Sequence, residues 1–135
     1  MLFRSSDLLY LVQSNTSKKV TVANFLSNAA NVTLSGNINV GGTAQTLASP
    51  GAISLTTPIT HLTADATGGT LTLNQGTTGQ IKCLVMSATS GGSYTLSANI
   101  AGSGTITFDH AGDTAQLMFT NTKWYVVGGT ASVTY

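Results

Sequence analysis

Beyond residue 51, apolar and polar positions alternate in short runs that are separated by glycine-containing turns. A period of two predicts β-strands that bury one face. Clear examples are residues 70–75 (TLTLNQ), 105–109 (TITFD) and 114–121 (TAQLMFTN). Pro58 interrupts the first run of the series and indicates an edge strand or a bulge. The pattern predicts an all-β body over residues 51–135, an antiparallel sandwich or barrel, since both need the same alternation.

The run at residues 80–87 (QIKCLVMS) is apolar on both faces. Ile81, Cys83 and Val85 fall on one face, and Leu84 and Met86 fall on the other. This pattern predicts a strand that is central in the sheet or lies between the core and a neighbouring subunit. Leu84 and Met86 are therefore candidate core or oligomer residues. Cys83, the only cysteine, is expected to be a buried core thiol.

Trp124 and Tyr125 open the run KWYVVGG at residues 123–129. Adjacent aromatic rings beside Asn and Thr could stack on a sugar. Strand alternation favours a different arrangement, in which Trp124 points inward as a core anchor and Tyr125 points outward. We place both residues with Leu84 and Met86 in the candidate core or oligomer set.

Residues 1–50 are predicted to form an N-terminal arm. Residues 7–13 (DLLYLVQ) predict a short strand, and residues 14–19 predict a polar turn that contains Lys18 and Lys19. The helical spacing i, i+3, i+4, i+7 is followed by Val22, Phe25, Leu26 and Ala29. With Thr21 as N-cap, this spacing predicts an amphipathic helix over residues 22–30. A helix of that length needs docking to persist.

Residues 31–50 read as two short strands and a linker, because apolar residues alternate there with polar ones between glycines. Pro50-Gly51 is the strongest internal break. We therefore place the boundary between the arm (residues 1–50) and the β-body (residues 51–135) at this point.

Charge is scarce in this sequence. Only 7% of the residues are charged, and the formal net charge is +1, whereas an average soluble domain carries about 25% charged residues. Unpaired charge is costly in a buried interface, so a surface of hydroxyls and amides suits a protein covered by its own copies or by a larger assembly. The lysines and arginine form no basic stripe, and we expect no nucleic-acid partner.

Chemistry-bearing motifs are nearly absent. The chain contains no Glu and no nucleophile elbow, phosphate loop or dinucleotide fingerprint. Asp109, His110 and Asp113, with His61 and Asp65, could hold a divalent ion. Gly and Asp at such positions are also what a tight hairpin turn requires, and we favour that interpretation. The sequence predicts no enzyme, no catalytic residue, no cofactor and no metal.

Residues 1–13 hold Arg4 and Asp7 around a short apolar stretch. This stretch is too short and too interrupted for a signal-peptide core or a membrane span. We expect a protein that is made and assembled in the cytoplasm, with no membrane partner.

Two stretches resemble virion proteins of tailed bacteriophages. Residues 5–28 (SSDLLYLVQSNTSKKVTVANFLSN) are similar to a short module of tail-fibre-like chains. Residues 70–128, with GTTGQIK and GDTAQLMFTNTKWYVVG, resemble β-domains of capsid-decoration and fibre-type proteins. The resemblance implies a virion location and a homotrimer in which apolar strand faces meet around a threefold axis.

Our first hypothesis is a homotrimeric capsid decoration (cement) protein that clamps adjacent major capsid proteins through residues 1–30. The small size and the start at Met1 favour it. The candidate attachment residues are Leu8, Tyr10, Lys18, Lys19, Val22, Phe25 and Leu26.

The alternative is a short trimeric fibre or knob on a tail or vertex protein, whose β-body meets a host surface glycan. The fibre-like N-terminal motif favours this alternative. A polysaccharide depolymerase is a third class, which would need a carboxylate pair in a groove, and the 4 acidic residues of the chain give it little support.

Overall fold

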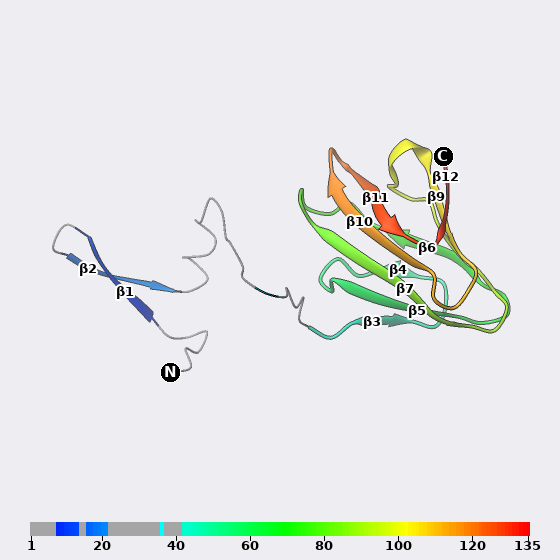
Figure 1. The fold of residues 1–135 in the computed structure, drawn as a ribbon, viewed down its shortest axis with the longest axis horizontal. Coiled ribbons are helices and arrows are strands. Elements are labelled where there is room, and N and C mark those ends of the chain that lie inside the picture. The colour runs from blue at the N-terminus through cyan, green and yellow to red at the C-terminus, as the bar shows by residue number, and fades with distance from the viewer. Residues whose placement is uncertain (1–7, 14–15, 22–35, 37–41) are drawn as a thin grey trace. The chain divides into compact units, whose positions relative to one another are not determined.

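The computed structural model describes residues 8–13, 16–21, 36 and 42–135. It comprises two compact units, Met1–Asn39 and Val40–Tyr135 (Figure 1). None of the helical turns in the described part of the chain has the length and hydropathy that a membrane crossing needs.

The first unit contains a pair of antiparallel strands. β1 (Leu8–Gln13) pairs with β2 (Thr16–Thr21), and Tyr10 lies opposite Lys19 in the register. The predicted polar turn at residues 14–19 is therefore wrong in its extent, because Lys18 and Lys19 belong to β2. β-branched residues such as Thr16, Val20 and Thr21 favour the extended backbone of β2. The predicted helix at residues 22–30 lies outside the described residues.

The second unit is all-β and consists of two five-stranded sheets packed face to face (Figure 1). Sheet 1 has the order β11 (Lys123–Gly129), β10 (Thr114–Thr120), β7 (Ile81–Thr89), β5 (Ile59–Ala64), β3 (Gln45–Leu47). Sheet 2 has the order β12 (Ser132–Thr134), β9 (Thr105–Phe108), β8 (Tyr94–Leu96), β6 (Gly69–Leu73), β4 (Ala52–Ile53). A 3-10 turn, η1 (Ala101–Ser103), is the helical element of this unit.

The sheets are mixed, so the predicted antiparallel arrangement is wrong for the first half of the sandwich. From β3 to β8 the chain crosses to the other sheet after every strand. Successive strands of one sheet therefore run parallel, as in the pairs β3–β5, β5–β7, β4–β6 and β6–β8. The glycine turns resemble hairpin turns in sequence, but here they connect strands of different sheets. β9 to β12 pair antiparallel and complete both sheets.

Strands β3 to β8 thus form three successive coils, each made of one strand from each sheet, and the corners of these coils stack on one another. The corner connections are residues 48–51, 65–68 and 90–93, each of four residues; we call them the corner column. A Cβ on Gly68 would lie 2.1 Å from the carbonyl oxygen of Ser93, and a Cβ on Gly69 would lie 2.3 Å from Cγ of Pro50. Gly68 and Gly69 are therefore required where successive coils approach closely.

The first coil extends the sandwich upstream of the predicted boundary. β3 precedes Pro50 and pairs with β5 through Gln45↔Thr60 and Leu47↔Leu62. Pro50 lies in the corner column, beneath Gly69, rather than in a linker between two units.

The core lies between the two sheets and is a single apolar cluster. Sheet 1 contributes Leu62, Ala64, Leu84, Met86, Ala115, Leu117, Phe119 and Trp124, and sheet 2 contributes Ile53, Leu71, Leu73, Tyr94, Leu96, Ile106 and Phe108. Trp124 packs edge-to-face against Phe119, with ring centroids 5.1 Å apart. An isolated bridge between Ile100 and Trp124 joins the two sheets along one side.

Candidate functional site: the outer face of sheet 1

Strand alternation gives each sheet one face toward the core and one face toward the outside. On sheet 1 the apolar side chains that point outward are Ile59, Ile81, Cys83, Val85, Met118, Tyr125 and Val127. We call this surface the apolar face. Polar neighbours on the same surface are uncharged hydroxyl or amide residues, apart from His61 and, at the end of β11, Lys123.

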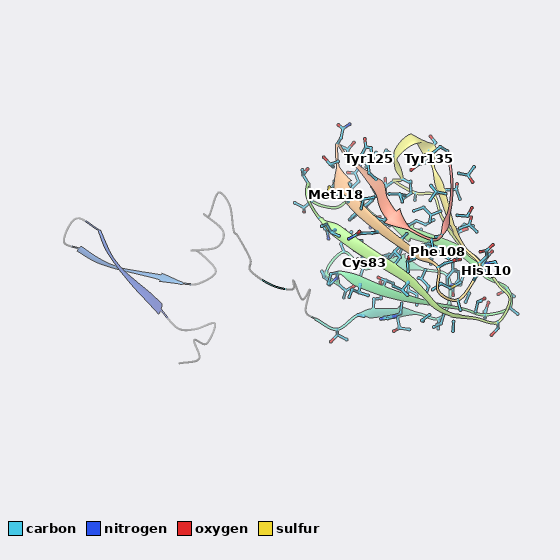
Figure 2. All side chains as sticks on the ribbon, viewed as in Figure 1. Cys83, Phe108, His110, Met118, Tyr125 and Tyr135 are labelled. Atoms are coloured by element: carbon cyan, nitrogen blue, oxygen red, sulfur yellow. The ribbon has the colours of Figure 1, made fainter. Side chains whose placement is uncertain are left out.

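A row of large side chains crosses the apolar face. Met118 lies opposite Ile81 on one side and opposite Tyr125 on the other. Directly opposite residues of neighbouring strands have side chains in contact range. The exposed fractions are 46% for Ile81, 36% for Met118 and 38% for Tyr125. These three residues form a ridge, and Figure 2 shows Met118 and Tyr125 at the same end of the sandwich.

The next row of the apolar face is hollowed. Ile59 lies opposite Cys83, and Cys83 lies opposite Gln116. A hollow of about 170 Å³ opens here, lined by Pro58, Ile59, Ile81, Cys83 and Gln116. On the other side of Cys83, where Gly128 offers no side chain opposite Gln116, a wider hollow of about 350 Å³ reaches β11.

Cys83 is therefore not the core thiol that the sequence predicts. Its neighbours Leu84 and Lys82 point inward, so alternation turns Cys83 outward, where it is half-buried between the two hollows. It is a free thiol among the described residues. The apolar run that contains it is two-sided, and only one of its sides belongs to the core.

The one cation in the middle of sheet 1 is turned away from the apolar face. Lys82 is fully buried on the inner side of β7. Its Nζ donates hydrogen bonds to the carbonyl oxygen of Thr57 and to Oγ1 of Thr60. Burial, which disfavours the charged form, lowers the pKa of Lys82 below its ordinary value of 10.5. As a result, the strands β5, β7 and β10 present no Asp, Glu, Lys or Arg on the outside.

Sheet 2 presents a different outer face, built of hydroxyl residues. They are Thr70, Thr72, Thr95, Thr105, Thr107, Ser132 and Thr134; we call this surface the hydroxyl face. The register aligns four of them in one row, through the pairs Thr70↔Thr95, Thr95↔Thr107 and Thr107↔Ser132. Hydroxyl groups are well hydrated, so the sandwich has one face suited to water and one suited to burial.

Asp109, His110 and Asp113, three of the residues that could hold a divalent ion, lie together in one turn. Oδ2 of Asp113 accepts backbone hydrogen bonds of 2.9 Å from both Asp109 and His110, and Nδ1 of His110 lies 2.7 Å from Oδ1 of Asp109. The hydrogen bond from the His110 backbone is the largest cause that lowers the pKa of Asp113 below its usual value. His61, on the outer face of β5, and Asp65, in the corner column, are not part of this cluster.

The predicted site residues fall in three places. Leu84, Met86 and Trp124 are fully buried in the core, and Tyr125 lies on the apolar face. Leu8 and Tyr10 lie in β1, and Lys18 and Lys19 lie in β2. Val22, Phe25 and Leu26 lie outside the described residues.

Sequence reasoning did not name Ile59, Ile81 or Met118 as site residues. The available signal was the two-sided apolar pattern of residues 80–87, which indicates that something beyond the core covers this strand. Comparison with family models, curated proteins and solved structures found no match for the chain.

Proposed function

We propose that this chain is a virion structural protein of a tailed bacteriophage, a homotrimeric capsid decoration (cement) protein that clamps adjacent major capsid proteins. The observation that carries the proposal is the apolar face, an exposed sheet surface whose central strands present no Asp, Glu, Lys or Arg. The N-terminal and body motifs described above, which resemble those of phage virion proteins, supply the setting.

The distribution of side chains favours assembly over catalysis. Burying apolar surface stabilises a complex by roughly 25 cal/mol per Å², and stable interfaces cover about 800 Å² on each partner. A two-sided sheet gives one chain an apolar outer surface in addition to its own core. Two of the three described acidic residues, Asp65 and Asp113, accept backbone hydrogen bonds within turns, and Asp109 lies beside His110. We therefore propose a binding and clamping role without turnover.

The N-terminal unit is the proposed attachment element. It forms a compact unit separate from the sandwich. Its strand pair sets Tyr10 opposite Lys19 and Leu11 opposite Lys18, so each lysine of β2 lies opposite an aromatic or aliphatic residue of β1. The proposed contacts to the major capsid protein are Leu8, Tyr10, Lys18, Lys19, Val22, Phe25 and Leu26.

A short trimeric fibre or knob is the second candidate. Tyr135 is 74% exposed and packs its ring against Gly102 and Gly104, which is a geometry open to sugar stacking. Trp124 is not available for such stacking, because its ring is buried. In this alternative the N-terminal unit attaches to a tail or vertex protein.

The test is the copy number of this protein in purified virions, measured by quantitative mass spectrometry against the major capsid protein. A copy number comparable to that of the capsid protein supports decoration. A few copies per particle would favour the fibre or knob. Absence from the virion would overturn both.

A second test addresses the attachment residues. Phe25→Asp should remove the protein from virions while the circular dichroism of the β-sandwich stays unchanged. Ser27→Asp, which adds the same charge at a polar position of the same predicted helix, is the matched control and should leave occupancy unchanged. Normal occupancy of the Phe25 variant would contradict attachment through this segment.

A further inference from the structure

We infer that the apolar face is the surface through which copies of this chain contact one another, with the hollow beside Cys83 receiving apolar side chains of the neighbouring copy's ridge. The inference rests on the proposed function in one respect: it identifies the surface that would build the proposed trimer. The occupant is a second copy of the chain rather than a different macromolecule.

The lack of charge on the apolar face favours a second copy of the chain as its occupant. An average soluble domain carries about 25% charged residues, and most of them lie on its surface. Docked on the apolar face, such a surface would bury charges with no partner, because β5, β7 and β10 offer none. A second copy presents the same strands, which have no Asp, Glu, Lys or Arg on the outside, so contact between the two faces buries no unpaired charge from these strands.

Shape supports the same occupant. The ridge of Ile81, Met118 and Tyr125 and the hollow of about 170 Å³ beside Cys83 lie on one surface, in neighbouring rows of the sheet. Unbranched Met and planar Tyr side chains are the types that fill apolar hollows at interfaces. Each copy thus carries both a protruding part and a recess that could receive it.

The two faces of the sandwich allow a matched experiment. Met118 projects from the apolar face and Thr72 from the hydroxyl face; both are exposed and both lie inside a strand. A lysine at either position can extend its amine into water in the isolated chain. Met118→Lys places this charge on the apolar face, and Thr72→Lys places the same charge on the opposite side.

The experiment measures the oligomeric state of the full chain by light scattering and native mass spectrometry over a range of concentrations. The unaltered protein and Thr72→Lys should form the same oligomer. Met118→Lys should raise the dissociation constant about 30-fold or more, as expected for a central interface residue, with unchanged circular dichroism. If Met118→Lys fails to fold, Tyr125→Lys, at the sheet edge, replaces it in the same comparison.

Cys83 provides a second readout without any substitution. In the oligomer its thiol should react with a maleimide about tenfold more slowly than in the dissociated Met118→Lys chain. Retention of the oligomer by Met118→Lys and Tyr125→Lys, or equal thiol reactivity in oligomer and monomer, would overturn the inference.

The outcomes separate the inference from the proposed function. An oligomer that depends on Met118 in a protein absent from virions would support this surface and refute the virion role. If the protein is present in virions but Met118→Lys and Tyr125→Lys both keep the oligomer, the result would support the virion role and refute this surface. A chain that is monomeric at every concentration would overturn the self-association surface, while the copy number in virions would still decide the virion role.

Discussion

Nε1 of Trp124 donates a 2.8 Å hydrogen bond to the carbonyl oxygen of Asn74, 50 residues earlier in the chain. This bond links β11 of sheet 1 to the connection that follows β6 of sheet 2. The backbone N–H of Trp124 also donates to the carbonyl oxygen of Asn99, whose Nδ2 in turn donates to the carbonyl oxygen of Leu73. Trp124 therefore closes the sandwich along one side through its ring and its backbone.

Trp124→Phe should destabilise the protein by about 2–4 kcal/mol, because it leaves a cavity in the core and removes the partner of the Asn74 carbonyl. Urea unfolding monitored by circular dichroism measures the change. Tyr125→Phe, at the next and exposed position, is the control and should change stability by less than about 0.5 kcal/mol. Equal effects of the two variants would contradict the closing role of Trp124.

Lys82 should give the stability of the protein a pH dependence in the alkaline range. Burial lowers its pKa in the folded state below the ordinary value of 10.5. Between these two pKa values the unfolded chain binds more protons than the folded one, so the free energy of unfolding rises with pH there. Below the pKa of Lys82 in the folded state, the amine is charged in both states, and the free-energy cost of burying that charge is fully present.

The comparison variant for this prediction is Lys82→Met, which keeps the length of the side chain but cannot titrate. The difference in free energy of unfolding between the unaltered protein and this variant should shift in favour of the unaltered protein as the pH rises toward 10.5. Urea unfolding at a series of alkaline pH values measures the difference. A difference that does not change with pH would show that the amine is not buried.

Gly68→Ala should be severely destabilising, by about 3 kcal/mol or more, because its Cβ would overlap the backbone of Ser93 and its φ is +65°. Gly91 lies in the same corner column with φ +105° and open space around it. Gly91→Ala should therefore cost only the backbone strain, about 1 kcal/mol. Thermal unfolding of the two variants distinguishes steric overlap from strain, and similar melting temperatures would contradict the stacking of the corners.

Asp113 should contribute to acid sensitivity. Backbone hydrogen bonds from His110 and Asp109 hold its pKa below the usual value of 3.8. Its contribution to stability is therefore fully present above that usual value and is lost as the pH falls through the lower, folded-state pKa. Asp113→Asn should unfold with a weaker dependence on pH in this acidic range, as followed by circular dichroism. A variant whose acid unfolding curve matches that of the unaltered protein would contradict this role.

Period-two alternation was sufficient to predict most strands of the sandwich and their inward sides, although it missed β2 of the first unit. Leu117 and Phe119 face the core as the pattern of residues 114–121 indicates, and Trp124 and Tyr125 lie on opposite sides of β11. Alternation says nothing about which strands pair. A four-residue glycine corner between two sheets has the same sequence character as a hairpin turn, so the parallel coils could not be predicted from it.

The inward orientation of Lys82, which leaves the outer face of β7 without a charge, was harder to predict. Lys82 is two residues from Leu84 and four from Met86, so strand alternation already places it on the inner side with them. Residue type argues the opposite, because lysine is rarely buried without a carboxylate. Only the positions of the Thr57 carbonyl and the Thr60 hydroxyl, which depend on the connection between β4 and β5, show how the amine is accommodated.

The coiled path of the chain also bears on the order in which the protein can form during synthesis. Every strand from β5 onward pairs with at least one strand that precedes it in the chain, and the longest separation within the sheets is that between Ile81 and Met118. Each new strand can therefore dock onto an edge that has already left the ribosome. Trp124 is synthesised after the coils that it fastens, so a chain truncated before this residue would lack the hydrogen bonds that close one side of the sandwich.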